Sequence, residues 1–293
     1  MNKKSIIGHH PQLQLLNAFL HKKKMHHSFL FCGPEHVGKM TIARSFAQKL
    51  IGGETNEGWM ICDVAHSDLV TIAPIVEEKK GKMVYKDISL DQLFSARRSF
   101  ALAPDQKAKV LIIDDAERMT ISAQNALLKT LEEPQKNRFI ILVAHRPDQL
   151  LETIVSRCFV VHFSLVNDPD FHAQGFDQQC VDDAQGRPGY AYRLQDDPEF
   201  VEIISFARDQ LRTLSRMSLV ERMQLATELS KKDEKYLSCF FYAWIYRVRL
   251  AALQTKKFHL LKIAQRVESV LVLLQDTNVN KQLAIEDLLI HIT

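Results

Sequence analysis

The sequence has 293 residues, 46% of them hydrophobic and 25% charged, an ordinary globular balance that excludes disordered and fibrous proteins. The net charge is only +3, so a protein that coats a polyanion is not expected. No apolar run approaches the roughly 20 residues of a membrane helix, and five scattered cysteines without a C-x-x-C spacing offer no disulfide framework, so we expect a cytoplasmic protein.

Short apolar runs alternate with amphipathic stretches over residues 1–165, which is the pattern of an α/β domain. The expected strands are 29–32, 69–72, 110–113, 139–143 and 160–163. The expected helices are 8–22, 39–51, 89–103, 120–133 and 148–155. The polar run 77–82 (EEKKGK) is expected to be a solvated turn. Because the strand segments are almost continuously hydrophobic, they predict a parallel sheet covered on both faces.

The rest of the sequence predicts helices alone. Residues 166–203 are rich in Asp, Gln and Pro and too few for a full domain, so we expect a small helical lid. All ten glycines lie at or before Gly189, and all nine prolines lie at or before Pro198. Beyond them, apolar residues recur at spacings of three and four. Residues 204–293 are therefore expected to form an all-α domain.

A phosphate-binding loop is predicted directly after the first strand. The segment that begins at Gly33 (GPEHVGK) matches G-x-x-x-x-G-K in a strand-loop-helix setting. In such a loop, backbone N–H groups face a phosphate and the lysine supplies a positive charge, so Gly33, Gly38 and Lys39 are candidate nucleotide-binding residues. The next position normally carries a hydroxyl for Mg²⁺ but here is Met40. Thr41 is the nearest hydroxyl, although it lies about 100° further around the helix.

Two acids follow the predicted strand 110–113. Asp114 and Asp115 stand where phosphate-loop ATPases handle the metal and the attacking water. Asp114 would be the metal-side carboxylate, and Asp115 is one methylene shorter than the glutamate expected at the catalytic position. The alternative is that both acids are solvated at the strand end or cap the next helix.

Further motifs carry a resemblance to a known family. They are 66–69 (HSDL), 102–104 (LAP), 125–134 (NALLKTLEEP), 156–158 (SRC) and 186–189 (GRPG). Together they make residues 5–195 resemble the AAA+ clamp-loader proteins of bacterial DNA polymerase III. The resemblance implies an AAA+ α/β domain over 1–165, a helical lid over 166–203 and an all-α collar domain for oligomerisation over 204–293.

The resemblance assigns a role to Arg157. In that family, the arginine of Ser-Arg-Cys reaches across a subunit boundary to the ATP of a neighbour. Carried over, Arg157 would be a catalytic arginine that acts in trans, where its charge offsets the negative charge developing on the transferred phosphoryl group. The alternative is an intrachain salt bridge or a surface arginine.

Several positions depart from the family pattern, besides the missing hydroxyl. Active relatives keep a threonine that senses the γ-phosphate where this sequence has Ala144 and His145. They place a second sensing arginine where Gly189 stands, with Arg187 and Arg193 nearby. These departures predict a degenerate nucleotide site, with no required cofactor and only weak ATP or ADP binding.

The family's four-cysteine zinc module is also reduced. Only Cys62 remains, with His66 four residues later, and these two ligands are too few for a closed tetrahedral site. We therefore expect no zinc and no metal site.

These observations predict a stator without efficient ATPase activity of its own. Its expected partners are clamp-loader ATPase subunits and a clamp-opening subunit, with the sliding clamp and primed DNA reached through the assembly. One alternative is a catalytically active ATPase of the same family. Another is a phosphate-loop kinase or transferase that acts on a small molecule.

Overall fold

The computed structural model describes residues 5–21, 26–52, 59, 66–79, 82–274 and 279–292. The chain divides into two compact units. The first comprises residues 1–181 and 186–189, and the second comprises residues 182–185 and 190–293. The division into three domains at 165 and 203 stays a prediction.

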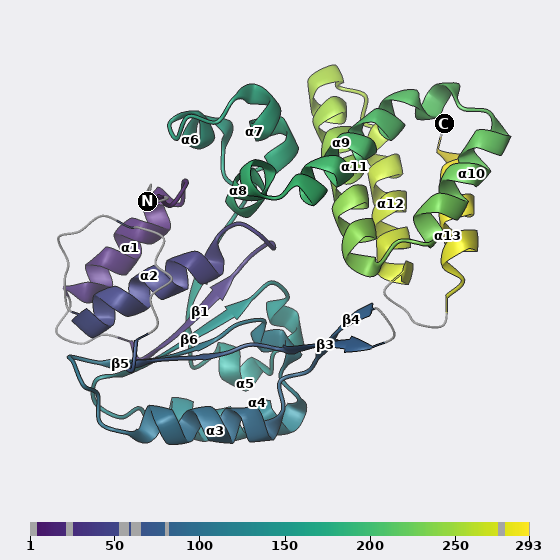
Figure 1. Ribbon diagram of the computed structural model, residues 1–293. Helices are drawn as coiled ribbons and strands as arrows, with labels where there is room; N and C mark the ends of the chain where they lie inside the picture. The colour runs from purple at the N-terminus through teal and green to yellow at the C-terminus, as the bar shows by residue number, and fades with distance from the viewer. Residues whose placement is uncertain are drawn as a thin grey trace. The chain divides into compact units, whose positions relative to one another are not determined.

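Five strands in the described part of the first unit form one sheet in the order β2-β5-β6-β1-β7 (Figure 1). They are β1 (Ser28–Cys32), β2 (Leu69–Ile72), β5 (Lys109–Ile113), β6 (Arg138–Ala144) and β7 (Phe159–His162). All neighbouring pairs are parallel. These parallel pairs confirm the predicted parallel sheet. All five strands therefore end on the same side of the sheet, and the connections between paired strands cross over its faces.

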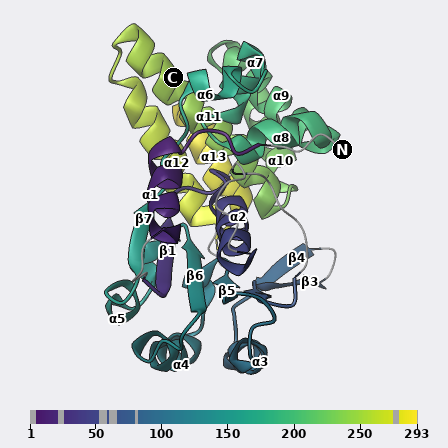
Figure 2. The same cartoon turned by 90° about the vertical axis from the view of Figure 1, so that its left-hand side faces the viewer.

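Helices cover both faces of this sheet. They are α1 (His10–Leu20), α2 (Lys39–Gly52), α3 (Leu90–Ala101), α4 (Ile121–Glu132) and the short α5 (Glu152–Val155). Alternate strand residues enter two cores, so that Phe29 and Phe31 pack with α1 and α2 whereas Leu30 and Cys32 pack with α3 and α4. Figure 2 shows these two pairs of helices on opposite sides of the sheet. The uninterrupted hydrophobicity of the strands reflects this double burial.

Two elements differ from the predictions. Residues 77–79 and 82 lie in two antiparallel strands, β3 (Ile75–Lys79) and β4 (Lys82–Lys86), so the predicted turn is wrong in extent; residues 80 and 81 lie outside the described residues. Val84 and Tyr85 favour strands, and this preference prevails over the charge pattern. The predicted helix 148–155 is broken before α5, because Leu150 has an extended backbone; the N–H of Leu151, the N-cap of α5, donates to the side-chain oxygen of Gln124 at 2.9 Å.

Helices make up the described chain from Asp168 onward. They are α6 (Asp168–His172), α7 (Gln178–Ala184), α8 (Pro188–Asp196), α9 (Pro198–Thr213), α10 (Leu219–Ser230), α11 (Glu234–Thr255), α12 (Leu260–Leu274) and α13 (Lys281–His291). In the second unit, the buried Trp244 of α11 donates its indole N–H to the carbonyl oxygen of Ala207 in α9 at 2.7 Å. Among the described helices, none is long and apolar enough to cross a membrane.

Candidate nucleotide site

The predicted phosphate loop joins β1 to α2. Gly33 has a φ of 145°, and a Cβ there would lie 2.0 Å from the carbonyl oxygen of Phe163, so only glycine fits. The ammonium group of Lys39 donates to the carbonyl oxygens of Gly33 at 2.7 Å and Pro34 at 2.6 Å, and Lys39 is only 6% exposed. Burial lowers the pKa of Lys39, although nearby acids oppose the shift. The ammonium group therefore binds carbonyl oxygens of its own loop rather than pointing to solvent.

The two residues after the lysine do not supply a metal ligand at the expected position. Met40 packs against the hydrophobic core between α1, α2 and the sheet. Thr41 lies half-buried in the first turn of α2. A thioether is a poor ligand for the hard cation Mg²⁺, which prefers oxygen. These residues do not fit the magnesium–nucleotide site that such a loop implies.

The two predicted acids follow β5 at the carboxyl edge of the sheet. Burial, reinforced by the charge of Asp115, raises the pKa of Asp114 to about 6. Asp115 has a left-handed backbone with φ of 46°, and burial raises its pKa as well, although His145 opposes that shift. The structure thus brings Asp114 and Asp115 to the same edge as the phosphate loop, where both side chains are more easily protonated than a free aspartate.

His145 contacts both the acids after β5 and Glu35 of the phosphate loop. The sequence analysis did not predict His145 as a site residue. Its Nδ1 lies 2.9 Å from Oε1 of Glu117 and 3.5 Å from Oδ1 of Asp115, while its Nε2 lies 3.3 Å from Oε1 of Glu35. Burial alone would lower the pKa of His145, but its hydrogen bond to Glu117 and the charges of Glu117, Glu35 and Asp115 raise it. The available signal was the position of His145 directly after β6, the strand next to β5.

Gly189 lies against the phosphate loop. Its backbone N–H donates to the carbonyl oxygen of His36 at 2.9 Å. A Cβ at position 189 would lie 2.9 Å from that oxygen, so this approach requires glycine. Arg193, one alternative for a sensing arginine, binds Asp197 at 2.7 Å within the second unit and stacks over Phe200.

Arg157 lies at the end of the sheet where the strands begin, whereas the phosphate loop lies where they end. The chain enters β7 two residues later at Phe159, which pairs with Phe29 near the start of β1. The five residues of β1 separate this edge from Gly33 by about 16 Å. Nη2 of Arg157 contacts Oε1 of Glu132 at 2.7 Å, and 36% of its side chain is exposed. Arg157 is therefore a surface residue remote from the phosphate loop of its own chain.

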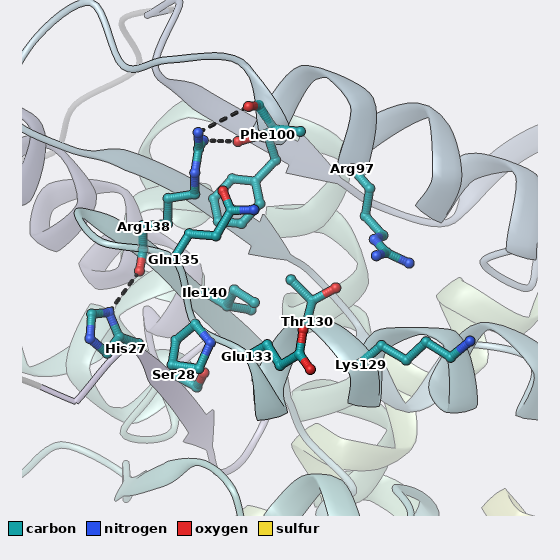
Figure 3. A pocket seen from close by; sticks show the side chains of 12 residues that line it. His27, Ser28, Arg97, Phe100, Lys129, Thr130, Glu133, Gln135, Arg138 and Ile140 are labelled. Atoms are coloured by element: carbon teal, nitrogen blue, oxygen red, sulfur yellow. Dashed lines mark hydrogen bonds between the residues drawn. The ribbon is translucent and has the colours of Figure 1, made fainter.

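A pocket of about 140 Å³ lies where β1 and β6 begin, at Ser28 and Arg138 (Figure 3). Arg97 of α3 and Lys129 of α4 line it. Arg138 also lines it, but its guanidinium donates to the carbonyl oxygens of Ala101 at 3.0 Å and Leu102 at 2.9 Å, so this arginine holds the end of α3. The pocket is thus separate from the candidate nucleotide site.

The motif 66–69 proves to be a structural element. Nδ1 of His66 accepts the backbone N–H of Asp68 at 3.0 Å. The carboxylate of Asp68 is completely buried and accepts the backbone N–H groups of Asp105 at 2.9 Å and Gln106 at 2.8 Å. Asp68 therefore fixes the loop before β5. Cys62, the other residue considered for zinc, lies outside the described residues.

The parallel strand order, the loop after β1 and the acids after β5 place this protein in the AAA+ class of phosphate-loop folds. A family model described as DNA polymerase III, delta subunit, matches residues 8–167, which is more than half of the chain. The chain therefore belongs to this clamp-loader family of DNA replication.

Individual relatives agree with that assignment. The chain is 32% identical over 161 residues to DNA polymerase III subunit delta' of Pseudomonas aeruginosa, covering 51% of this chain and 47% of that protein. It is 25% identical over 293 residues to subunit tau of Bacillus subtilis, covering 98% of this chain and 48% of tau. The chain thus spans about half the length of the curated relatives it matches.

A solved structure supports the fold alone. The gamma subunit-related protein of DNA polymerase III from Thermotoga maritima has a TM-score of 0.50 and 21% sequence identity, over 95% of this chain and 97% of that one. This likeness extends to the helices after the sheet domain.

Proposed function

We propose that this chain is a delta-prime-like, non-motor subunit of the bacterial DNA polymerase III clamp loader. In this role it supplies Arg157 in trans to a neighbouring ATPase subunit during sliding-clamp loading. The observation that carries the proposal is the contrast between two sites. Lys39 is bound by carbonyl groups of its own loop, whereas Arg157 is exposed at the other edge of the sheet.

The proposed function implies that the chain's own nucleotide site is degenerate. Hydrolysis needs a metal ligand at position 40, and Met40 packs against the core instead. The backbone of Gly189 occupies the space beside His36. Gly33, Gly38 and Lys39 still favour a phosphate, so weak ATP or ADP binding is retained without efficient turnover.

The position of Arg157 supports action in trans. An arginine about 16 Å from its own phosphate loop cannot serve that loop without a large rearrangement, but it is accessible to another subunit. A guanidinium delivered to the transferred phosphoryl group can contribute about 10³ to 10⁵ in rate. To act there, it has to leave the exposed carboxylate of Glu132 and the carbonyl oxygen of Thr153, which it contacts at 2.7 and 3.0 Å.

The partners follow from the same assignment. They are gamma/tau-like ATPase subunits and a delta-like clamp-opening subunit, with the sliding clamp and primed DNA bound through the assembly in the cytoplasm. Residues 204–293 would form the collar that joins the ring, after a lid over 166–203. With a net charge of only +3, this chain alone would bind DNA weakly, so any contact with the DNA backbone is shared across the assembly.

A reconstituted clamp loader tests the role of Arg157. Replacing the wild-type chain by Arg157→Ala should lower DNA-dependent ATP hydrolysis at least tenfold while the complex keeps its size in gel filtration. Arg98→Ala, at an exposed arginine of α3, is the matched control and should hydrolyse at the wild-type rate. Undiminished hydrolysis with Arg157→Ala in an intact complex would overturn the proposal.

An active ATPase resembling gamma/tau is the second candidate. It is favoured by the match to tau over 98% of the chain and by the retention of Lys39 and Asp114. Steady, magnesium-dependent ATP turnover by the purified chain, abolished by Lys39→Ala, would establish this function. The stator proposal predicts no such turnover.

A further inference from the structure

The described residues beside the phosphate loop contain a compact set of metal-binding groups that the proposed function does not use. Asp115, Glu117 and His145 each offer one ligand atom, and these atoms lie within 4.8 Å of one another. They come from the loop after β5 and from the end of β6. The acids alone would be a common surface feature, but here an imidazole lies among them.

Glu117 has a buried carboxylate oxygen that no described group satisfies. Its side chain is 1% exposed, and Oε1 accepts the backbone N–H groups of His145 at 3.1 Å and Arg146 at 3.3 Å. Its other oxygen, Oε2, is buried without a hydrogen-bond partner in the described part of the chain. Leaving a buried carboxylate oxygen unsatisfied is costly, and a coordinated cation would remove that cost.

The orientation of His145 suits coordination through Nδ1. Without a metal, Nδ1 hydrogen-bonds Glu117 at 2.9 Å. Oε1 of Glu35 lies 3.3 Å from Nε2 and can accept a proton there, so a metal that displaces the Nδ1 proton would meet the Nδ1 lone pair on the side of Asp115 and Glu117. A carboxylate that holds the far nitrogen of a ligating histidine is a common feature of metal sites. Glu35 would thus position the ring without binding the metal.

The spacing and the donor types identify the class of metal. Two donors at about 2.0–2.2 Å from a tetrahedral ion lie about 3.4 Å apart. Nδ1 of His145 is 3.5 Å from Oδ1 of Asp115, which matches, and 2.9 Å from Oε1 of Glu117, a hydrogen-bond distance that would lengthen when the metal binds. One imidazole and two carboxylates suit Zn²⁺ and neighbouring first-row ions, whereas Mg²⁺ prefers oxygen alone. We propose that Asp115, Glu117 and His145 bind a divalent transition-metal ion.

This site differs from a magnesium–nucleotide site and from the reduced cysteine module, because it needs neither a triphosphate nor Cys62. It is independent of the proposed function. A metal there would bring a positive charge to an edge where Glu35, Asp115 and Glu117 otherwise repel phosphate. The expectation of no metal site came from the reduced set of ligands at Cys62 and His66 and from other histidines interpreted as surface or loop residues, and it did not include His145 as a ligand.

Calorimetric titration of the chelator-treated full chain with Zn²⁺ tests the proposal. We expect one equivalent to bind, and Co²⁺ to give the visible absorption of a low-coordinate site. A tenfold excess of Mg²⁺ should not compete. Glu35→Gln should weaken Zn²⁺ binding by about 10- to 100-fold, as loss of a residue that orients a ligand does.

Asp115→Asn is the decisive variant, because His145→Ala leaves Glu117 buried without its partner and can unfold the chain. Asp115→Asn should lower the affinity at least tenfold with an unchanged circular dichroism spectrum. His10→Ala is the matched control, since His10 contacts one carboxylate, Asp170, at 3.1 Å, and it should bind Zn²⁺ as the wild type does. Wild-type binding weaker than about 1 mM, equal affinity in Asp115→Asn, or loss of binding in Cys62→Ser would overturn the proposal.

Discussion

The backbone N–H of Gly189 donates to the carbonyl oxygen of His36 in the phosphate loop at 2.9 Å. His36 has a left-handed backbone with φ of 61°, which turns its carbonyl toward this donor. Gly189 is the second residue of α8, so the start of that helix is bonded directly to the loop. An arginine side chain at this position would need the loop to move.

Replacing Gly189 by alanine should destabilise the chain. Alanine normally favours a helix by about 1 kcal/mol over glycine. Here the added Cβ would lie 2.9 Å from the oxygen and 3.2 Å from the Cβ of His36, so the loop must shift. We expect the free energy of unfolding to fall by about 1–2 kcal/mol, measured by urea denaturation.

Gly52→Ala is the control for that experiment. Gly52 ends α2, and a Cβ there would meet only the side chain of Gln106 at 4.0 Å. This variant should unfold at the same urea concentration as the wild type or at a higher one. A Gly189→Ala protein that is stabilised like Gly52→Ala would show that position 189 does not touch the loop in solution.

The fold was predictable because its strands, phosphate loop and helix ends are each specified by residues that are close together in the sequence. Each strand of the parallel sheet is a run of apolar residues, and the phosphate loop is a contiguous motif whose glycines are required by backbone geometry. The helix at 120–133 was found because Thr120 caps it, accepting the N–H of Ala123, and Pro134 prevents its extension.

The site was only partly predictable, because its remaining contacts join residues distant in sequence. Glu117 and His145 face each other only because β5 and β6 are neighbours. Asp68 looked like a fragment of a family motif, yet its partners come from 37 and 38 residues later. No local pattern specifies which buried acid receives a lysine such as Lys109.

Asp68→Asn should destabilise the first unit in a pH-dependent manner. Burial would raise the pKa of Asp68, but the N–H groups of Asp105 and Gln106 and the ammonium of Lys109 lower it below its ordinary value of 3.8. Because the folded pKa is the lower one, the ionised carboxylate stabilises the fold above about pH 4, and this contribution is lost as the pH falls through the folded pKa. At pH 7 we expect a loss of about 3 kcal/mol, since Lys109 keeps a buried charge.

Denaturation at several pH values checks this prediction. The difference between wild type and Asp68→Asn should be largest near neutral pH and shrink below pH 4. Asp105→Asn, whose carboxylate accepts the Ser67 hydroxyl in an exposed bond, is the control and should change stability by less than about 0.5 kcal/mol. A pH-independent difference would show that the charge of Asp68 is not what stabilises this loop.

Arg222→Met should loosen the end of the second unit. The buried guanidinium of Arg222 donates to the carbonyl oxygens of Leu289 at 2.8 Å, Ile292 at 3.0 Å and Leu214 at 3.0 Å. Methionine keeps much of the apolar volume but leaves these buried acceptors unpaired, at a cost of about 3 kcal/mol. Hydrogen exchange should accelerate first in α13. The exposed Arg216→Met is the control, and equal exchange in both variants would contradict this account.

Substitutions in the ion pair between Arg157 and Glu132 can distinguish a structural role of the arginine from a functional one. Its side chains are 36% and 47% exposed, and such pairs contribute about 0–1 kcal/mol. Glu132→Gln should therefore leave the unfolding transition almost unchanged, as should Arg157→Ala.

The two substitutions should differ in the assembled loader. If Arg157 acts on the ATP of a neighbour, its removal abolishes a charge at the reacting phosphate, whereas Glu132→Gln only frees the guanidinium from a competitor. We expect ATP hydrolysis to fall at least tenfold with Arg157→Ala and to stay equal or rise with Glu132→Gln. If the arginine served only to hold α4, both variants would break the same contact and lower hydrolysis alike. A double-mutant cycle distinguishes the two cases, because a shared structural contact gives non-additive losses whereas independent roles give additive effects.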